Sequence, residues 1–146
     1  IMKIKIIDAK ESNQISNCFD IRKKVFVEEQ GVPVEEELDN FDDISIHALA
    51  LIDNKPVATG RLILSKNKVA KVGRMAVLDN FRRTGIGSRV LLFLEKKAIE
   101  KKIEEISLHA QEYVMNFYKN HGYKERGTVF LEAGIKHIEM FKIIEK

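Results

Sequence analysis

The chain has 146 residues, of which 45% are hydrophobic and 32% charged, and its formal net charge is +3. This length and composition suit one compact core, so we expect residues 1–146 to form a single domain. No apolar run approaches the roughly 20 residues of a membrane span, and we expect no secretory signal at the N-terminus. Cys18 is the only cysteine, which excludes an internal disulfide and a cysteine metal cluster and indicates a reducing, cytoplasmic location.

Acidic and basic side chains are concentrated in different parts of the chain. Residues 28–43 contain eight Asp or Glu and no Lys or Arg, whereas residues 61–104 contain twelve Lys or Arg and four acids. This separation could present an acidic and a basic surface to two different ligands. A solvated acidic loop and a solvated helix face are the alternative, which charge counting alone favours.

The hydrophobic pattern predicts an α/β fold. Strands are indicated by alternating apolar residues, helices by apolar residues three and four positions apart, and turns by Gly, Pro and Asp-Asn pairs. In chain order, the predicted elements are a strand at 2–8, one or two helices within 11–29, a loop at 31–43, strands at 45–52, 56–64 and 71–78, a helix ending near Lys102, a strand at 104–110, a short helix at 112–120, and two strands within 127–144. A mixed sheet with helices on both faces accommodates this order.

A short arginine–glycine loop, NFRRTGIGS at residues 80–88, leads into the long helix. Backbone N–H groups at a helix start lack partners within the helix, and together with the helix dipole they form an anion site. Gly85 and Gly87 would let these amides approach phosphate oxygens, and Arg82 and Arg83 add positive charge. The loop therefore suits a phosphate or pyrophosphate, although an ordinary helix start with two solvated arginines explains the pattern at least as well.

Two widespread phosphate-binding motifs do not fit this loop. A Walker loop is excluded because the sequence G-x-x-x-x-G-K-[ST] does not occur. A dinucleotide fingerprint fits poorly because Val90 stands where a third Gly or Ala belongs.

Two motifs carry a resemblance to a known family. RRTGIG, Arg82 to Gly87, resembles the [RQ]-x-x-G-x-[GA] loop of the GNAT superfamily of acyl-CoA-dependent N-acetyltransferases. FYKNHGY, Phe117 to Tyr123, resembles the LYEKLGF element of that superfamily, and GRMAV resembles the strand before its loop. A narrower resemblance is to small bacterial ElaA-like and YjcF-like acetyltransferases, and it spans residues from about Ile21 to Met140. Its pieces are IRKKVFVEEQGVP, the acidic stretch after it, IHALA, ATGRL and GIKHIEM.

The resemblance implies a fold and a cofactor site. The fold would be a GNAT-like mixed, splayed central sheet of about six to seven strands, with helices on both faces. Acetyl-CoA, as co-substrate, would lie between the strands at 71–78 and 104–111, with its pyrophosphate on the backbone N–H groups from Arg83 to Ser88. Gln111 stands where the usual pattern has Asn. The implied cofactor-binding residues are Met75, Ala76, Val77, Arg82, Arg83, Thr84, Gly85, Ile86, Gly87, Ser88, Gln111 and Tyr118.

Tyr118 has two interpretations. By periodicity alone it is a packing residue on the apolar face of a short helix. The resemblance instead implies a catalytic role, with its hydroxyl acting as general acid when the CoA thiolate leaves. A phenol with pKa about 10 and a thiol with pKa about 8.5 make full proton transfer uphill by roughly 2 kcal/mol. A hydrogen bond to the developing thiolate, or a modestly lowered tyrosine pKa, would suffice.

The acceptor side is less defined by the sequence. Many members of the superfamily carry a Glu on the fourth strand as general base, whereas this strand has Arg74 and no acid. His109 is a candidate catalytic base, and an ordinary strand histidine is an equally good interpretation. Glu29, Glu36 or a water relay are alternatives. The resemblance suggests Phe26, Glu29, Gln30 and His137 as substrate-binding residues.

The sequence is thus identified as resembling an acetyl-CoA-dependent N-acetyltransferase that acts on a primary amine by direct attack. The acceptor could be a small-molecule amine or a protein amine, and the enzyme could be a monomer or a homodimer. We expect no metal, nucleic acid or membrane partner. The alternatives are a non-catalytic acyl-CoA-binding sensor, and a transferase of a longer acyl chain.

Overall fold

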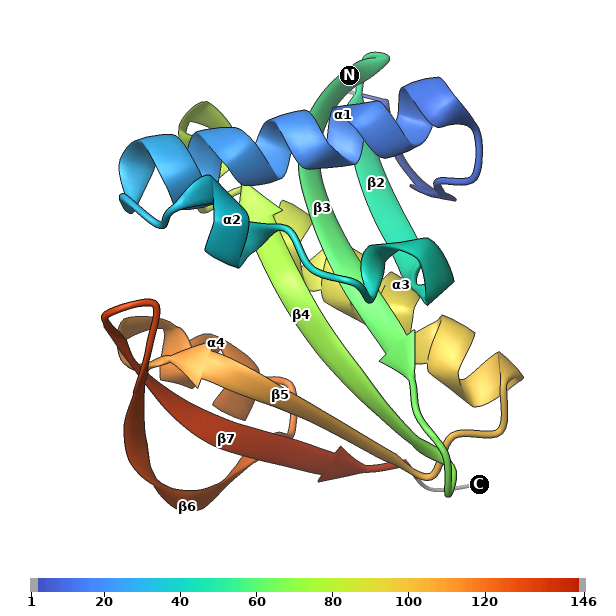
Figure 1. Cartoon of the computed structure of the whole chain (residues 1–146). Helices are drawn as coiled ribbons and strands as arrows, with labels where there is room; N and C mark the ends of the chain where they lie inside the picture. Colours follow the sequence, from blue (N-terminus) through green and yellow to red (C-terminus); the bar gives the residue numbers. More distant parts are fainter. Residues whose placement is uncertain (1–2, 145–146) are drawn as a thin grey trace.

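The framework of the protein is one seven-stranded sheet with the strand order β1-β2-β3-β4-β5-β7-β6. The computed structural model describes residues 3–144, and its helices cover both faces of the sheet (Figure 1). The elements are β1 (Ile4–Asp8), α1 (Ser12–Arg22), the π-helical segment η1 (Lys23–Glu29), α2 (Val34–Glu37), η2 (Asp42–Ile44), β2 (Ile46–Ile52), β3 (Lys55–Leu64), β4 (Val69–Val77), η3 (Asp79–Phe81), α3 (Ile86–Glu100), β5 (Glu105–Gln111), η4 (Glu112–Val114), α4 (Met115–Lys119), β6 (Lys124–Glu132) and β7 (Ile135–Ile143). The predicted mixed sheet with helices on both faces is confirmed.

The boundaries differ from the sequence-based prediction in three places. The predicted loop at 31–43 contains the short helix α2 and part of the helical turn η2. The fourth strand begins at Val69 and the sixth at Lys124, both earlier than predicted, because strand pairing extends further than local alternation indicates. Met2 of the predicted first strand lies outside the described residues.

The strands β4 and β5 separate partway along their length. They are the one parallel pair among the described strands, and they are paired only from Val69 with Glu105 to Val72 with Leu108. Just beyond this point the β3–β4 register is interrupted by a bulge, where Arg74 has a φ of 51°. From there β4 follows β3 and β5 follows β7, so the two halves of the sheet form an open V (Figure 1). The predicted splay is confirmed.

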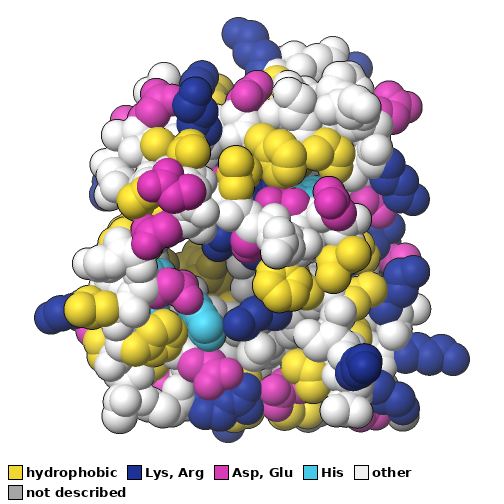
Figure 2. Space-filling view, in the orientation of Figure 1, with side chains coloured by type: hydrophobic (Ala, Val, Ile, Leu, Met, Phe, Trp, Pro, Cys, Tyr) yellow, Lys and Arg dark blue, Asp and Glu magenta, His cyan; other side chains and the backbone are white. Residues whose placement is uncertain are grey.

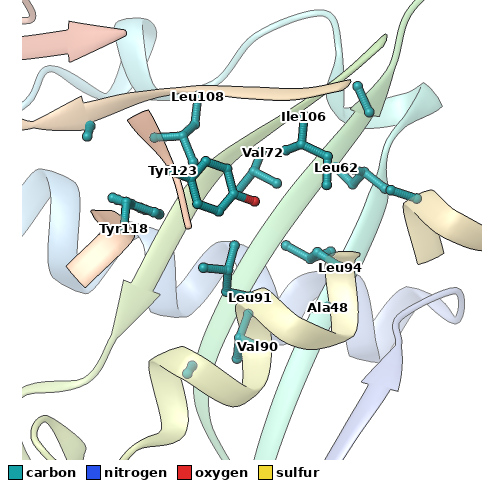
Figure 3. Close-up of a cluster of buried hydrophobic side chains, with 14 of the residues drawn as sticks. Ala48, Leu62, Val72, Val90, Leu91, Leu94, Ile106, Leu108, Tyr118 and Tyr123 are labelled. Atoms are coloured by element: carbon teal, nitrogen blue, oxygen red, sulfur yellow. The ribbon is translucent and has the colours of Figure 1, made fainter. Parts of the chain in front are cut away.

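Two hydrophobic clusters pack on the two faces of the sheet. The larger one joins α3 to the strands and includes Leu91, Leu94 and Leu108, with Tyr118 at one end (Figure 3). The smaller one joins α1 and η1 to the other face through Cys18, Ile21, Val25, Leu49 and Ala76. Full burial of each such leucine contributes roughly 1.5–3 kcal/mol, so these two clusters fix the positions of α1 and α3.

Part of the acidic stretch at residues 28–43 is not solvated, contrary to what charge counting favoured. Glu37 and Asp42 are bonded to Arg22, which is fully buried, with Arg22 Nη1 2.7 Å from Asp42 Oδ1. Arg61 bonds to Asp39 and Asp42, and Arg74 bonds to Glu37 and Asp39. This buried network attaches the α2–η2 segment to α1, β3 and β4.

The network also has an acid-labile component. Burial by itself would raise the pKa of Asp42, but hydrogen bonds and charge interactions with Arg22 and Arg61 outweigh it and lower the pKa. A lowered carboxyl pKa contributes stability above the ordinary carboxyl range, and this contribution is lost as the pH falls through the lowered pKa.

We predict that Arg22→Met destabilises the protein by about 3 kcal/mol, because it leaves Glu37 and Asp42 buried without their main partner. Urea unfolding at neutral pH measures this change. Lys119→Met is the matched control, since Lys119 makes an exposed ion pair with Glu125 that is worth about 0–1 kcal/mol. Equal losses in the two variants would contradict the stabilising role of the network.

Candidate active site

The N-terminus of α3 lies at the open end of the V without a side-chain cap. Gly85 precedes the helix with a φ of 84°, a left-handed conformation that glycine adopts without strain. No acidic residue lies in the first turn, and the first intrahelical bond runs from Arg89 N to the Gly85 carbonyl oxygen at 3.2 Å. This geometry is compatible with the anion site that the loop motif predicts, which stays a prediction.

Gly87 serves a different purpose from Gly85. A Cβ built on Gly87 would lie 3.6 Å from Val77 Cγ2 and 3.7 Å from Phe117 Cζ, which is ordinary van der Waals contact. Packing therefore does not require glycine at this position.

Arg82 links this loop to η1, which packs on the α1 side of the same arm of the V. Its Nη2 lies 2.9 Å from Glu29 Oε1 on η1, and its Nε donates to the Val77 carbonyl oxygen at 2.9 Å. Asp79 is a further, more distant partner. Arg82, a predicted cofactor residue, and Glu29, a predicted substrate residue, are thus bonded to each other.

A second contact joins the end of η1 to β5, on the other arm of the V. The Gln111 side-chain amide donates to Gln30 Oε1 at 2.9 Å, and the Gln30 amide donates to Gln111 Oε1 at 3.2 Å. The Gln30 amide also lies 3.2 Å from the hydroxyl of Tyr113, which the sequence analysis did not identify. The end of η1, a π-helical segment of the kind often found at functional sites, therefore contacts both arms of the V.

Tyr118 lies on the α3 side of the sheet and is 7% exposed. Its ring packs edge-on against Phe117 and Tyr123, at centroid distances of 5.0 and 5.9 Å. The Tyr118 hydroxyl forms no hydrogen bond with any residue from 3 to 144. Its oxygen is nevertheless not completely enclosed by other atoms, so a ligand could reach it. Burial raises the pKa of the Tyr118 phenol. The structure therefore favours a neutral hydrogen-bond donor over a tyrosine of lowered pKa.

His109 lies on the opposite, α1 side of the sheet. Its neighbours Leu108 and Ala110 point into the α3-side core, and strand alternation places His109 on the other face. Its Nδ1 is 3.1 Å from Glu132 Oε1, and its ring packs edge-on against Phe130. The two predicted catalytic residues, Tyr118 and His109, are thus on different faces, and the splay is the opening between these faces.

The remaining residues predicted for the acceptor lie on the α1 side of the sheet. His137 is buried beside Phe130, and its Nδ1 donates to the Ile135 carbonyl oxygen at 2.7 Å. Phe26 packs in the α1-side cluster, and Glu36 is exposed on α2. Figure 2 shows a hollow near the centre of the α1-side surface, with a histidine side chain at its edge and both acidic and basic side chains around it.

Besides Tyr113, sequence reasoning missed two further polar residues at the site. Glu132 contacts His109, but no local motif indicates which face of β6 it occupies. His121 Nε2 lies 3.0 Å from Ser88 Oγ at the start of α3. His121 stands where the family element LYEKLGF has Leu, and this departure was a signal that could have identified it.

Comparison with known proteins supports the resemblance. The family described as acetyltransferase (GNAT) domain matches residues 10–144. The uncharacterized N-acetyltransferase YjcF of Bacillus subtilis is 38% identical over 140 residues, which cover 95% of this chain and 99% of YjcF.

Solved structures agree in fold. A Lactobacillus plantarum protein assigned as an N-acetyltransferase superposes with a TM-score of 0.90 and 26% identity, covering 96% of this chain and 97% of that protein. Escherichia coli ElaA superposes with a TM-score of 0.84 over 97% of this chain and 99% of its own; at 23% identity it shows likeness of fold alone. None of the helices in residues 3–144 is long and apolar enough to cross a bilayer. The family match over residues 10–144 and the near full-length similarity to YjcF show that the chain belongs to the GNAT acetyltransferases and is an acyltransferase.

Proposed function

We propose that this protein is an acetyl-CoA-dependent N-acetyltransferase that transfers an acetyl group to a primary amine by direct attack. One observation carries the proposal: beyond Val72 the edge of β4 facing β5 has no strand partner, and this free edge leads to the uncapped N-terminus of α3. Such an arrangement suits an extended ligand with an amide-bearing arm and an anionic end. The pantetheine and pyrophosphate of acetyl-CoA have this chemistry.

In the proposed complex, backbone groups of Met75, Ala76 and Val77 pair with the pantetheine arm. Backbone N–H groups from Arg83 to Ser88 bind the pyrophosphate. Arg82 adds charge there once it exchanges its partner Glu29 for a phosphate oxygen. This exchange is favourable because a guanidinium binds phosphate in a bidentate manner.

The proposed reaction uses both faces of the sheet. The amine lone pair attacks the thioester carbonyl carbon, and a backbone N–H near Val77 stabilises the tetrahedral oxyanion. The carbon–sulfur bond then breaks, with the neutral Tyr118 hydroxyl donating a hydrogen bond to the departing thiolate. An alkyl amine with pKa near 10.4 is protonated at neutral pH, so His109 accepts one proton before the attack, and the second proton that nitrogen loses as the amide forms is passed to the departing thiolate, which leaves as the thiol.

The proposed acceptor approaches from the α1 side, past Phe26, Glu29, Gln30 and His137. Exposed acids on η1 and α2 would attract a cationic amine, which could belong to a small molecule or to a protein. We further propose that residues 1–146 act as one domain, as a monomer or a homodimer, in the cytoplasm, where a free buried thiol such as Cys18 persists.

The test combines binding with turnover. Purified protein is incubated with acetyl-CoA and a panel of primary amines, and released thiol and acetylated products are measured. CoA should raise the melting temperature, as any ligand specific for the native state does. Stabilisation by CoA without turnover would support the sensor alternative, and faster turnover with longer acyl-CoA thioesters would support the longer-chain alternative. Absence of any CoA-induced shift would overturn the proposed cofactor.

Gly87→Asp should weaken CoA binding at least tenfold without lowering the melting temperature. The new carboxylate would interact favourably with the helix dipole and the free amides, and would thereby compete with the pyrophosphate. Gly87→Ala is the control, because its methyl group fits in ordinary contact distance. Titration calorimetry with CoA measures both affinities. Unchanged CoA affinity in the aspartate variant would show that the pyrophosphate binds elsewhere.

Tyr118→Phe should lower the single-turnover rate by roughly 10- to 1,000-fold, because a positioned proton or hydrogen-bond donor contributes on this scale. Acetyl-CoA affinity should change little, since its proposed contacts lie on β4 and α3. Tyr123→Phe is the control: it also removes a hydroxyl from this core, but that hydroxyl bonds to Glu95. Rapid-quench measurements over a range of pH compare the variants. A wild-type rate for Tyr118→Phe would remove the residue from the mechanism.

A further inference from the structure

We propose that Glu132 is a positioning residue, which holds His109 in the tautomer that can accept a proton from the acceptor amine. The inference rests on the proposed function, because it concerns the base in that reaction. It assigns a role to a residue that neither the motifs nor the family resemblance indicates. Glu132 carries the one carboxylate bonded to the His109 ring within residues 3–144.

The tautomer follows from hydrogen-bond chemistry. His109 Nδ1 lies 3.1 Å from Glu132 Oε1, and an ionised carboxylate can only accept a hydrogen bond. Nδ1 must therefore carry the hydrogen. In the neutral ring Nε2 then has the free lone pair, which is the arrangement that a general base requires. The same carboxylate stabilises the imidazolium that forms when His109 takes up the proton.

The other charged groups near His109 do not replace Glu132. Glu139 lies directly across from His109 in the β5–β7 register, but its carboxylate is bonded to Arg126 at 3.1 Å. Arg126 also bonds to Glu105 on β5, the strand that carries His109. Arg126 is thus shared between Glu105 and Glu139, and neither of these carboxylates bonds to the His109 ring, whereas that of Glu132 does.

His137 cannot take the role of His109. Its Nδ1 donates to the Ile135 carbonyl oxygen, so in the neutral ring Nε2 is an acceptor. This Nε2 is 3.7 Å from Glu132 Oε2, which is too long for a hydrogen bond. His137 is also buried, whereas 29% of the His109 side chain is exposed. His109 is therefore the histidine that an acceptor can reach.

The hairpin between β6 and β7 explains why Glu132 is in position. Glu132 pairs with Ile135 across a two-residue turn, in which Ala133 and Gly134 have φ values of 52° and 75°. Positive φ at both central residues is typical of the tight turn that matches strand twist. This turn fixes the register, and a slip of one residue would move the Glu132 side chain to the other face of the sheet.

A test independent of catalysis reads the tautomer directly. Nitrogen-15 spectra of the imidazole rings in the cofactor-free protein should show His109 with hydrogen on Nδ1. Glu132→Ala should shift His109 towards the Nε2–H form, because the acceptor for Nδ1–H is lost. Glu132→Gln should keep the Nδ1–H form, since its carbonyl oxygen still accepts. Glu139→Ala is the matched control and should leave the His109 tautomer unchanged.

The kinetic test separates this role from simple structural support. Glu132→Ala should lower kcat on the order of tenfold or more, leave the KM for acetyl-CoA unchanged, and move the acidic limb of the pH–rate profile to lower pH. The limb moves in this direction because the lost negative charge no longer favours the protonated ring.

The outcomes distinguish two failures. A wild-type protein that binds CoA but transfers no acyl group would contradict the proposed function, whatever the tautomer. An active wild type whose Glu132→Ala variant keeps the His109 tautomer, kcat and pH profile would overturn the positioning role alone. Glu132→Gln keeps the size of the side chain and an acceptor oxygen. If this variant also lost the Nδ1–H signal, misfolding rather than the missing acceptor would explain the loss of activity.

Discussion

The divergence of β4 from β5 after Val72 and Leu108 is the constraint on which the rest of the structure depends. A parallel pair that stops partway leaves backbone groups unsatisfied, and these must find partners in water or in a ligand. The bulge at Arg74 turns β4 away, and Gly60 on β3 makes room for it: a Cβ there would lie 2.6 Å from Met75 Sδ. The open edge is therefore built into the packing of the strands.

The candidate cofactor residues and the candidate acceptor residues lie on opposite faces of the sheet beside this opening. The α3 face carries the uncapped helix N-terminus and Tyr118, which suit the CoA side of the reaction. The α1 face carries His109, Glu132 and His137, which suit the amine side. In the proposed reaction a neutral, buried phenol and a partly exposed imidazole would have opposite tasks, and their environments differ accordingly: burial raises the tyrosine pKa, and the imidazole has a carboxylate partner.

The segment η1 connects the two halves. Glu29 bonds to Arg82 beside the helix N-terminus, and Gln30 bonds to Gln111 at the end of β5. Two residues of the expected acceptor side are thus paired with two residues of the expected cofactor side. The buried network around Arg22 attaches the α2–η2 segment, which follows η1 in the chain, to α1.

The sequence alone determined the strand and helix order and the family, and it predicted an anion site in the loop at residues 80–88, because these depend on local periodicity and on short contiguous motifs. It misjudged the acidic stretch, since the partners Arg22, Arg61 and Arg74 come from three other elements. It also missed Glu132, whose place depends on the register of a hairpin and on the distant strand β5. Tertiary structure decided which side chains share a face, because strand pairing, and not position in the chain, sets which residues meet across a sheet.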